Sequence, residues 1–111
     1  MAFIITRDIL TPQVNAVLSE GNQVTDATGW ISPSDTSEAV KRRLTGGAGE
    51  TFRLLDDDDE VYYEGRYIDT LGVGDVDELS LDGDLGPWAW SRGEGTTQIQ
   101  YLRDGAWVGL I

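Results

Sequence analysis

Histidine and cysteine are absent from the 111 residues of this chain, and their absence excludes most familiar active-site chemistry. Without them there is no Ser-His-Asp or Cys-His nucleophile, no imidazole or thiolate zinc site, and no disulfide or thiol redox centre. The remaining reactive groups are carboxylates, hydroxyls, arginines and a lysine, and their spacing matches no recognised catalytic motif. We therefore expect a protein that is not an enzyme and that needs no metal or other cofactor.

Long apolar runs are also missing. No window approaches the roughly 18 apolar residues of a membrane-spanning helix, and residues 1–10 lack the basic start of a secretory signal. We expect one cytoplasmic domain over residues 1–111, without membrane contact. A chain of this size buries only about 60–65% of its unfolded surface, so its few aromatic side chains must supply much of the core.

Positive charge is scarce, because 8 basic residues stand against 20 acidic ones and give a formal charge of -12. Residues 50–94 hold 14 acidic and 3 basic residues, a net -11, and so carry nearly all of the excess. Such a field repels DNA and anionic membranes and attracts basic protein surfaces. Acidity of this kind also fits compositional drift in a salt-adapted or GC-rich source, and the sequence leaves both explanations open.

The segment before residue 35 gives weak structural signals. Residues 2–6 alternate and are rich in Phe and Ile, which predicts a first strand. Residues 11–34 mix polar residues with apolar ones at helical spacing, which is typical of a helical turn or an ordered loop. We expect the Trp30-Ile31 pair to anchor this segment to the core.

A short helix is predicted after it. Asp35 with Glu38 three residues later fits a capping box, and Gly46-Gly47 provides a stop, which gives about ten helical residues. Its cations, Lys41 to Arg43, lie where they complement the carbonyl end of the helix dipole. A solvated helix end explains them better than a nucleic-acid contact does, because the rest of the chain is so acidic.

Two hairpins are predicted in the second half. If Asp58-Asp59 forms a two-residue loop, Leu55 faces Tyr62, Leu54 faces Tyr63 and Arg53 faces Glu64. Near the C-terminus, residues 97–103 and 106–111 flank Asp104-Gly105, a dipeptide typical of type I′ turns.

In this C-terminal hairpin, Ile99 then faces Leu110, Tyr101 faces Val108 and Leu102 faces Trp107. It is apolar on both sides, which predicts a central or doubly covered position. Leu79 and Leu81 indicate a further short strand. Together these elements predict an α+β domain: an antiparallel sheet of four to six strands, rich in hairpins, with one short helix packed on it.

Three segments carry a resemblance to a known group of proteins. Residues 52–58 (FRLLDDD), 60–66 (EVYYEGR) and 95–101 (GTTQIQY), with Gly105-Ala106-Trp107 after them, resemble small, largely uncharacterised proteins of phages and prophages. The resemblance covers about the C-terminal half. It implies a mobile-element origin and no catalytic residues.

The acidic runs are the first candidate site. Asp56, Asp57, Asp58, Asp59 and Glu60 are consecutive, and Asp82 and Asp84 form a looser pair. A calcium loop starting at Asp56 would need Gly at Val61 and Glu at Tyr67, so we interpret the run as a solvated acidic turn. Asp35-Thr36-Ser37 is similar to an aspartic-protease turn, but no apolar strand precedes it and a helix cap explains it.

Trp88 and Trp90 are the second candidate. They lie on one face if the segment is extended, and could form an interaction hot spot or a base-stacking platform. Core packing is the simpler interpretation, since so small a domain needs its Trp residues inside.

Three functions therefore stand as hypotheses. The first is an interaction protein, such as an anti-CRISPR or DNA-mimic inhibitor, whose acidic face binds a basic, nucleic-acid-binding protein surface without touching nucleic acid itself. The second is a structural or accessory virion protein that acts through apolar hairpin and Trp contacts, and the third is a carboxylate enzyme. We expect a monomer or a weak homo-oligomer.

Overall fold

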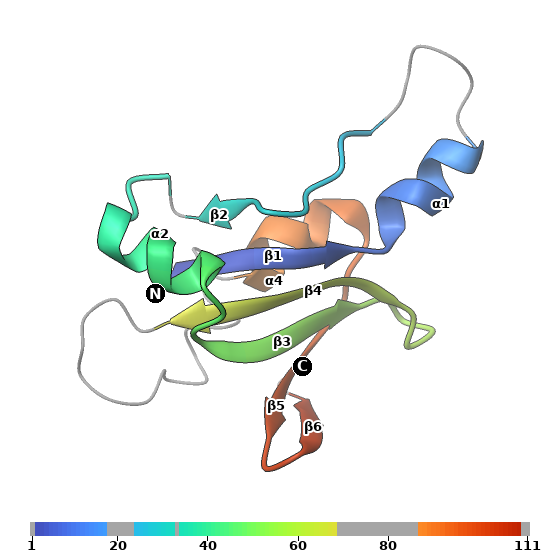
Figure 1. Ribbon diagram of the computed structural model, residues 1–111. Coiled ribbons are helices and arrows are strands. Elements are labelled where there is room, and N and C mark those ends of the chain that lie inside the picture. The colour runs from blue at the N-terminus through green and yellow to red at the C-terminus, as the bar shows by residue number, and fades with distance from the viewer. Residues whose placement is uncertain (1, 18–23, 33, 69–86, 110–111) are drawn as a thin grey trace.

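Six strands form one antiparallel sheet in the order β2-β1-β4-β3-β5-β6 (Figure 1). This is a computed structural model, and it describes residues 2–17, 24–32, 34–68 and 87–109. The strands are β1 (Ala2–Asp8), β2 (Ile31–Ser32), β3 (Glu50–Leu55), β4 (Val61–Ile68), β5 (Gln98–Arg103) and β6 (Ala106–Gly109). The helices are α1 (Leu10–Val17), α2 (Glu38–Thr45) and α4 (Pro87–Ser91), and the 3-10 turn η1 (Arg92–Glu94) follows α4. The predicted α+β class is confirmed, with three short helices among the described residues where one was expected.

One face of the sheet carries the main core. Alternate residues of four strands point to this face, because side chains alternate across a pleated sheet. They are Phe3, Ile5, Phe52, Leu54, Tyr63, Tyr67, Ile99 and Tyr101, and all are buried. The Trp rings of α4 and Leu10 of α1 pack over them. In Figure 1, α4 lies behind the sheet, on this covered face.

Gly65 lets the central strands of this core approach closely. It faces Phe52 in β3 and Ile5 in β1. A Cβ at this position would lie 2.3 Å from the Ile4 carbonyl oxygen and 2.6 Å from the ring of Phe52. The missing side chain leaves room for Phe52 to meet the ring of Phe3 edge-on, with 5.9 Å between the ring centroids.

Helix α2 covers one end of the opposite face. Its Leu44 is buried against Ala2, Ile4 and Ile68 in a second, smaller cluster. Figure 1 shows α2 in front of the sheet at that end only. The rest of the sheet in that direction has no helix over it among the described residues.

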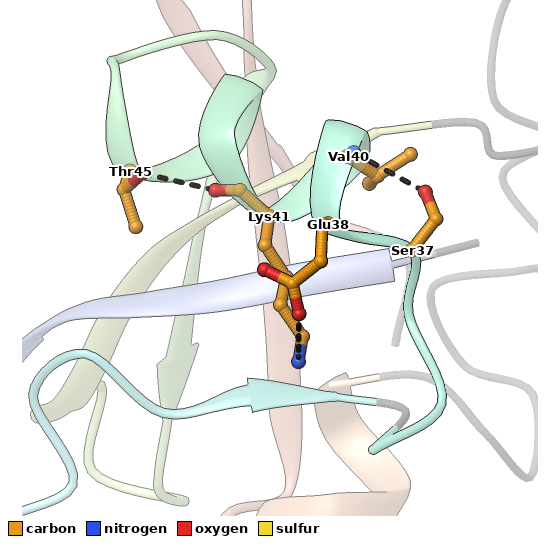
Figure 2. A network of polar contacts seen from close by, with 5 residues as sticks. All are labelled: Ser37, Glu38, Val40, Lys41 and Thr45. Carbon is orange, nitrogen blue, oxygen red and sulfur yellow. Dashed lines mark hydrogen bonds and ion pairs between the residues drawn. The ribbon is translucent and has the colours of Figure 1, made fainter.

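The N-terminus of α2 differs from the prediction. Ser37 is the N-cap, and its Oγ accepts a hydrogen bond from the Val40 N–H at 3.3 Å. Asp35 therefore lies before the helix, which has eight residues rather than ten. Glu38 forms an i,i+3 ion pair with Lys41 at 3.5 Å instead of completing a capping box (Figure 2). Gly46 ends the helix, as expected, and its N–H donates to the Arg42 carbonyl.

Asp8 organises the segment between β1 and β2. It is buried, and its carboxylate accepts hydrogen bonds from Thr11 N–H at 2.8 Å, from Ala27 N–H at 2.9 Å and from the Thr11 hydroxyl. The carboxylate thus caps the start of α1, an eight-residue helix where the sequence indicated a single turn or a loop. Trp30 was expected in the core and is 53% exposed; its backbone, not its ring, is bonded to Ile5.

The two predicted hairpins are present. In the first, Arg53 faces Glu64 and Leu54 faces Tyr63, as expected, but Leu55 faces Val61 rather than Tyr62. A register shift at Leu55 is the reason, because the loop is longer than two residues. In the second, Tyr101 faces Val108 and Leu102 faces Trp107, and Asp104 and Gly105 both have positive φ.

The C-terminal hairpin is not central, which corrects the prediction. Strand β6 is an edge of the sheet, so of the two strands of this hairpin only β5 has a neighbour on each side. Val108 is 37% exposed and Leu102 36% exposed, so the hairpin is covered on neither side at these positions. Leu110, Leu79 and Leu81 lie outside the described residues.

No helix within the described residues is long and apolar enough to cross a membrane.

Candidate functional site

The acidic run forms the tip of the β3–β4 hairpin. The Asp59 N–H donates to the Asp56 carbonyl at 3.2 Å, and the Asp56 N–H donates to the Glu60 carbonyl at 3.0 Å. Asp59 has a φ of 62°, the left-handed conformation that Asp tolerates better than most residues. The loop is thus a β-turn followed by a left-handed residue and a bulge, and we call residues Asp56–Glu60 the acidic turn.

One side chain of the acidic turn faces inward and orders the backbone. The Asp56 Oδ1 accepts hydrogen bonds from the Asp58 N–H at 2.8 Å and from the Glu60 N–H at 3.0 Å. An Asp carboxylate that bonds to the chain two residues ahead is a common way to fix a turn. Asp56 therefore shapes the turn rather than offering its charge to a partner.

Strand β5 fixes the acidic turn from the side. The Gln98 Nε2 donates to the Asp56 carbonyl and to the Asp59 Oδ1, both at 2.7 Å. The neighbouring Thr97 N–H donates to the Leu55 carbonyl at 2.9 Å. Gln98 therefore bonds to two residues of the turn, and Thr97 holds the adjacent end of β3, so the geometry of the turn does not depend on the hairpin alone.

Three carboxylates project from this ordered backbone. Asp57, Asp58 and Glu60 are exposed, and none of them forms an ion pair within the described residues. Asp59 is exposed as well, although one of its oxygens accepts from Gln98. The acidic turn is thus a compact set of negative charges that the described part of the fold leaves uncompensated.

Hydrogen bonding lowers the pKa of the carboxyl at the start of the turn. The Glu60 N–H that donates to Asp56 holds the pKa of that carboxyl below its ordinary value of 3.8, and the Asp58 N–H and Tyr62 hydroxyl act in the same direction. Burial raises the pKa of Tyr62, and its hydrogen bond to Asp56 adds to the effect. Asp56 therefore stays an acceptor and Tyr62 stays a donor at neutral pH.

Trp88 and Trp90 lie in α4, so the segment is helical and not extended. Residues two apart do not share a helix face. The ring of Trp90 packs edge-on against Tyr63 at 4.9 Å and lies 6.1 Å from Phe3. Both Trp side chains are partly buried against the main core. The core interpretation thus describes most of their contacts, and neither forms an exposed stacking platform with the other.

Trp88 differs from Trp90 in having a cation beside its ring. The guanidinium of Arg92 lies 5.3 Å from its ring centroid, a cation–π arrangement. Its indole N–H is buried with no acceptor among the described residues. Beyond α4 the chain passes Gly95, which lies beside the ring of Tyr62. Tyr62 thus lies between the acidic turn and the segment that follows the Trp pair.

Several buried polar side chains in the described part of the chain are already hydrogen-bonded within the fold. Asp8 is buried, but its oxygens already accept three hydrogen bonds. No group of three or more acidic residues in that part could hold a metal ion. The buried hydroxyls of Ser91 and Thr96 bond to each other at 2.6 Å. Asp82 and Asp84 lie outside the described residues.

The sequence did not predict a cluster of partly buried side chains on the sheet face that carries α2. Arg53, Gln100 and Trp107 meet there from three adjacent strands. The pairing of Arg53 with Glu64 and of Leu102 with Trp107 was predicted, but the pairing of β3 with β5 was not. Nothing local in the sequence indicates which two hairpins lie side by side.

Comparisons with known proteins assign no role to the candidate site. No protein-family model, curated protein or solved structure matches the chain. The likeness to phage and prophage proteins remains a prediction from the sequence.

Proposed function

We propose that this chain is a non-enzymatic interaction protein whose acidic turn binds a basic surface on a partner protein. The observation that carries the proposal is the ordered geometry of the turn. Exposed carboxylates are common, but here their backbone is fixed by Asp56 and Gln98 before any partner arrives. A charged group that is already in place loses less conformational entropy on binding.

The finer form of the proposal is an inhibitor of a nucleic-acid-binding protein. A surface that has evolved to meet phosphates accepts carboxylates on a rigid support, and charge complementarity speeds the encounter. The partner would then be a component of host defence or gene control, as with anti-CRISPR or DNA-mimic proteins. The resemblance to phage proteins is the reason to propose that the protein acts in the host cytoplasm, as a monomer or weak oligomer.

The experiment that tests this proposal is capture of partners from a host lysate with four charges of the turn removed. The variant is Asp57→Asn, Asp58→Asn, Asp59→Asn and Glu60→Gln. Asn still tolerates the left-handed position and still offers an oxygen to Gln98, so the turn should keep its shape. We expect the parent to capture a basic nucleic-acid-binding protein at low salt, and the variant to lose it.

A matched control removes as many charges elsewhere. Asp26→Asn, Asp35→Asn, Glu38→Gln and Asp104→Asn are four exposed positions outside the turn. The control has the same net charge as the test variant, so it should still capture the partner. If both variants lose the partner equally, net charge and not the acidic turn is responsible, and the proposal is wrong.

One observation favours the second candidate, a structural or accessory virion protein. The edge strand β6 and its neighbour expose Val108 and Leu102 on opposite sides of the sheet edge. Exposed apolar edges can pair with another chain. Stable homotypic rings in solution, insensitive to salt, would support this candidate over the first.

A further inference from the structure

The part of the sheet face that α2 leaves uncovered carries charge of the opposite sign to the acidic turn. Arg53 and Glu64 are cross-strand partners, Arg66 follows Glu64 by two residues, and Arg7 pairs with Glu64 from β1. Three arginines and one glutamate give this area a net charge of +2. We call it the arginine face; it also includes Thr51, Gln100, Leu102 and Trp107.

Its charges are only loosely paired within the described residues. The Arg7 Nη1 lies 3.8 Å from the Glu64 Oε1, and the Arg7 side chain is 66% exposed. Arg66 donates one hydrogen bond, to the Ala48 carbonyl at 3.3 Å. A surface ion pair of this length contributes little to stability. The positive charge therefore remains available to a ligand.

Arg53 is held in one orientation at the centre of this face. Its Nε donates to the Gln100 Oε1 at 2.7 Å, and its guanidinium carbon lies 4.1 Å from the centroid of the Trp107 ring. The hydrogen bond and the stacking together fix the plane of the guanidinium. Its two terminal nitrogens have no acceptor within the described residues. They are therefore free to donate a pair of hydrogen bonds to one carboxylate.

The surroundings of Arg53 match those of a protein contact. Trp and Arg are the side chains most enriched where binding energy is concentrated. Leu102 faces Trp107 across the strand pair and is exposed, which adds apolar area next to the charged group. An arginine alone would bind any anion. An arginine beside exposed apolar area favours a segment that has both a carboxylate and apolar side chains.

We propose that the arginine face docks a carboxylate-bearing segment of a partner protein, with the acidic side chain on the terminal nitrogens of Arg53 and apolar side chains on Trp107 and Leu102. A long polyanion is disfavoured, because the acidic turn begins only three residues beyond Arg53. The Debye length at physiological salt is about 8 Å, so a short segment at Arg53 interacts mainly with the charges of the arginine face, three arginines and one glutamate, which sum to +2. This proposal does not require the acidic turn to bind anything.

The test is an NMR titration of the full chain with a capped peptide, Leu-Asp-Glu-Asp-Leu, and its amide counterpart, Leu-Asn-Gln-Asn-Leu. We expect the acidic peptide to move the Arg53 Nε–H and Gln100 side-chain signals in a saturable way. The amide peptide should leave these signals in place, because an amide has no pair of charged oxygens to accept two hydrogen bonds from the guanidinium. Equal shifts with both peptides would overturn the proposal.

Variants separate the fork from simple charge. Arg53→Lys keeps the charge and loses the planar fork, so the affinity for the acidic peptide should fall about tenfold. Arg42→Lys makes the same change on an exposed residue of α2 and should alter it less than about twofold. Gln100→Glu places a carboxylate beside Arg53 and should also block the peptide, which provides a second variant if Arg53→Lys does not fold. Equal losses in the two lysine variants would overturn the proposal.

Two further results would assign the face to another occupant. Stronger binding of a single-stranded oligonucleotide of five nucleotides would make it a phosphate site. Shifts of the same signals with protein concentration alone would make it a contact between copies of this chain. Either result would overturn docking of a partner's carboxylate segment.

Discussion

The side chains of Gln98 and Asp59 are joined by a hydrogen bond of 2.7 Å across 39 positions of the sequence. The same Gln98 amide nitrogen donates to the backbone of Asp56. The start of β5 thereby fixes the tip of a different hairpin. This contact makes the acidic turn part of the sheet rather than a free loop.

Removing this contact should loosen the turn without unfolding the protein. In Gln98→Ala we expect faster hydrogen exchange at the Asp58 and Glu60 amides and a loss of about 1 kcal/mol in the free energy of unfolding. Exchange measured by NMR tests this directly. Gln13→Ala, an exposed change on α1, is the control and should alter neither quantity. Unchanged exchange in Gln98→Ala would show that Asp56 alone orders the turn.

Gly65 should tolerate no side chain. Its Cβ would collide with the Ile4 carbonyl and with the ring of Phe52, so Gly65→Ala should destabilise the fold by at least about 2 kcal/mol. A Cβ added at Gly93 would meet nothing within 4 Å, so Gly93→Ala should change stability far less. Denaturant titration of both variants checks the difference. Similar stabilities would mean that the central strands are not packed this closely.

Tyr101 should be the most costly residue to truncate in the C-terminal hairpin. It is 3% exposed and belongs to the main core, so Tyr101→Ala should cost about 2–4 kcal/mol. Val108, its cross-strand partner, lies at the exposed edge, and Val108→Ala should cost much less. A loss below about 0.5 kcal/mol for Tyr101→Ala would show that the residue is not buried.

The hydrogen bonds to Asp56 predict a dependence of stability on pH. The folded state lowers the pKa of this carboxyl below 3.8, so its ionised form contributes stability above that pH and loses the contribution as pH falls through the folded value. Asp56→Asn should therefore be less stable than the parent at neutral pH, and the difference should shrink below pH 3.8. Thermal unfolding at a series of pH values measures it.

The control for this pH effect is Asp57→Asn. It removes one charge from the same turn, but its carboxylate accepts no hydrogen bond within the described residues. The pH-dependent difference should be absent from this variant. A difference of equal size in both variants would assign the effect to the charge of the turn as a whole.

Local signals in the sequence predicted the class of the fold and several of its contacts. Alternation and turn dipeptides place both hairpins and the pairs Arg53–Glu64, Leu54–Tyr63 and Tyr101–Val108, because these depend on neighbouring strands joined by short loops. The α2 stop at Gly46 follows equally from local chemistry. Such features need no knowledge of the rest of the chain.

The failures arise where distant segments decide the outcome. Ser37 rather than Asp35 caps α2; Ser and Asp are both good N-cap residues, so the local sequence does not decide between them. Trp30 is exposed although its side chain is apolar. Its contact with β1 is a backbone hydrogen bond, in which the Ile5 N–H donates to the Trp30 carbonyl. The attachment of Gln98 to the acidic turn requires β3 to pair with β5, which no local pattern indicates.

In the proposed function, the ordered carboxylates of the acidic turn drive association with a basic partner. The most direct test is the association rate of the captured partner with the parent and with the four-residue turn variant, measured by surface plasmon resonance over a range of salt concentrations. We expect the parent to associate at least about tenfold faster than the turn variant at low salt and this advantage to fade as salt rises. The control variant with four charges removed outside the turn should behave like the parent. Equal association rates for the parent and the turn variant at every salt concentration would contradict it.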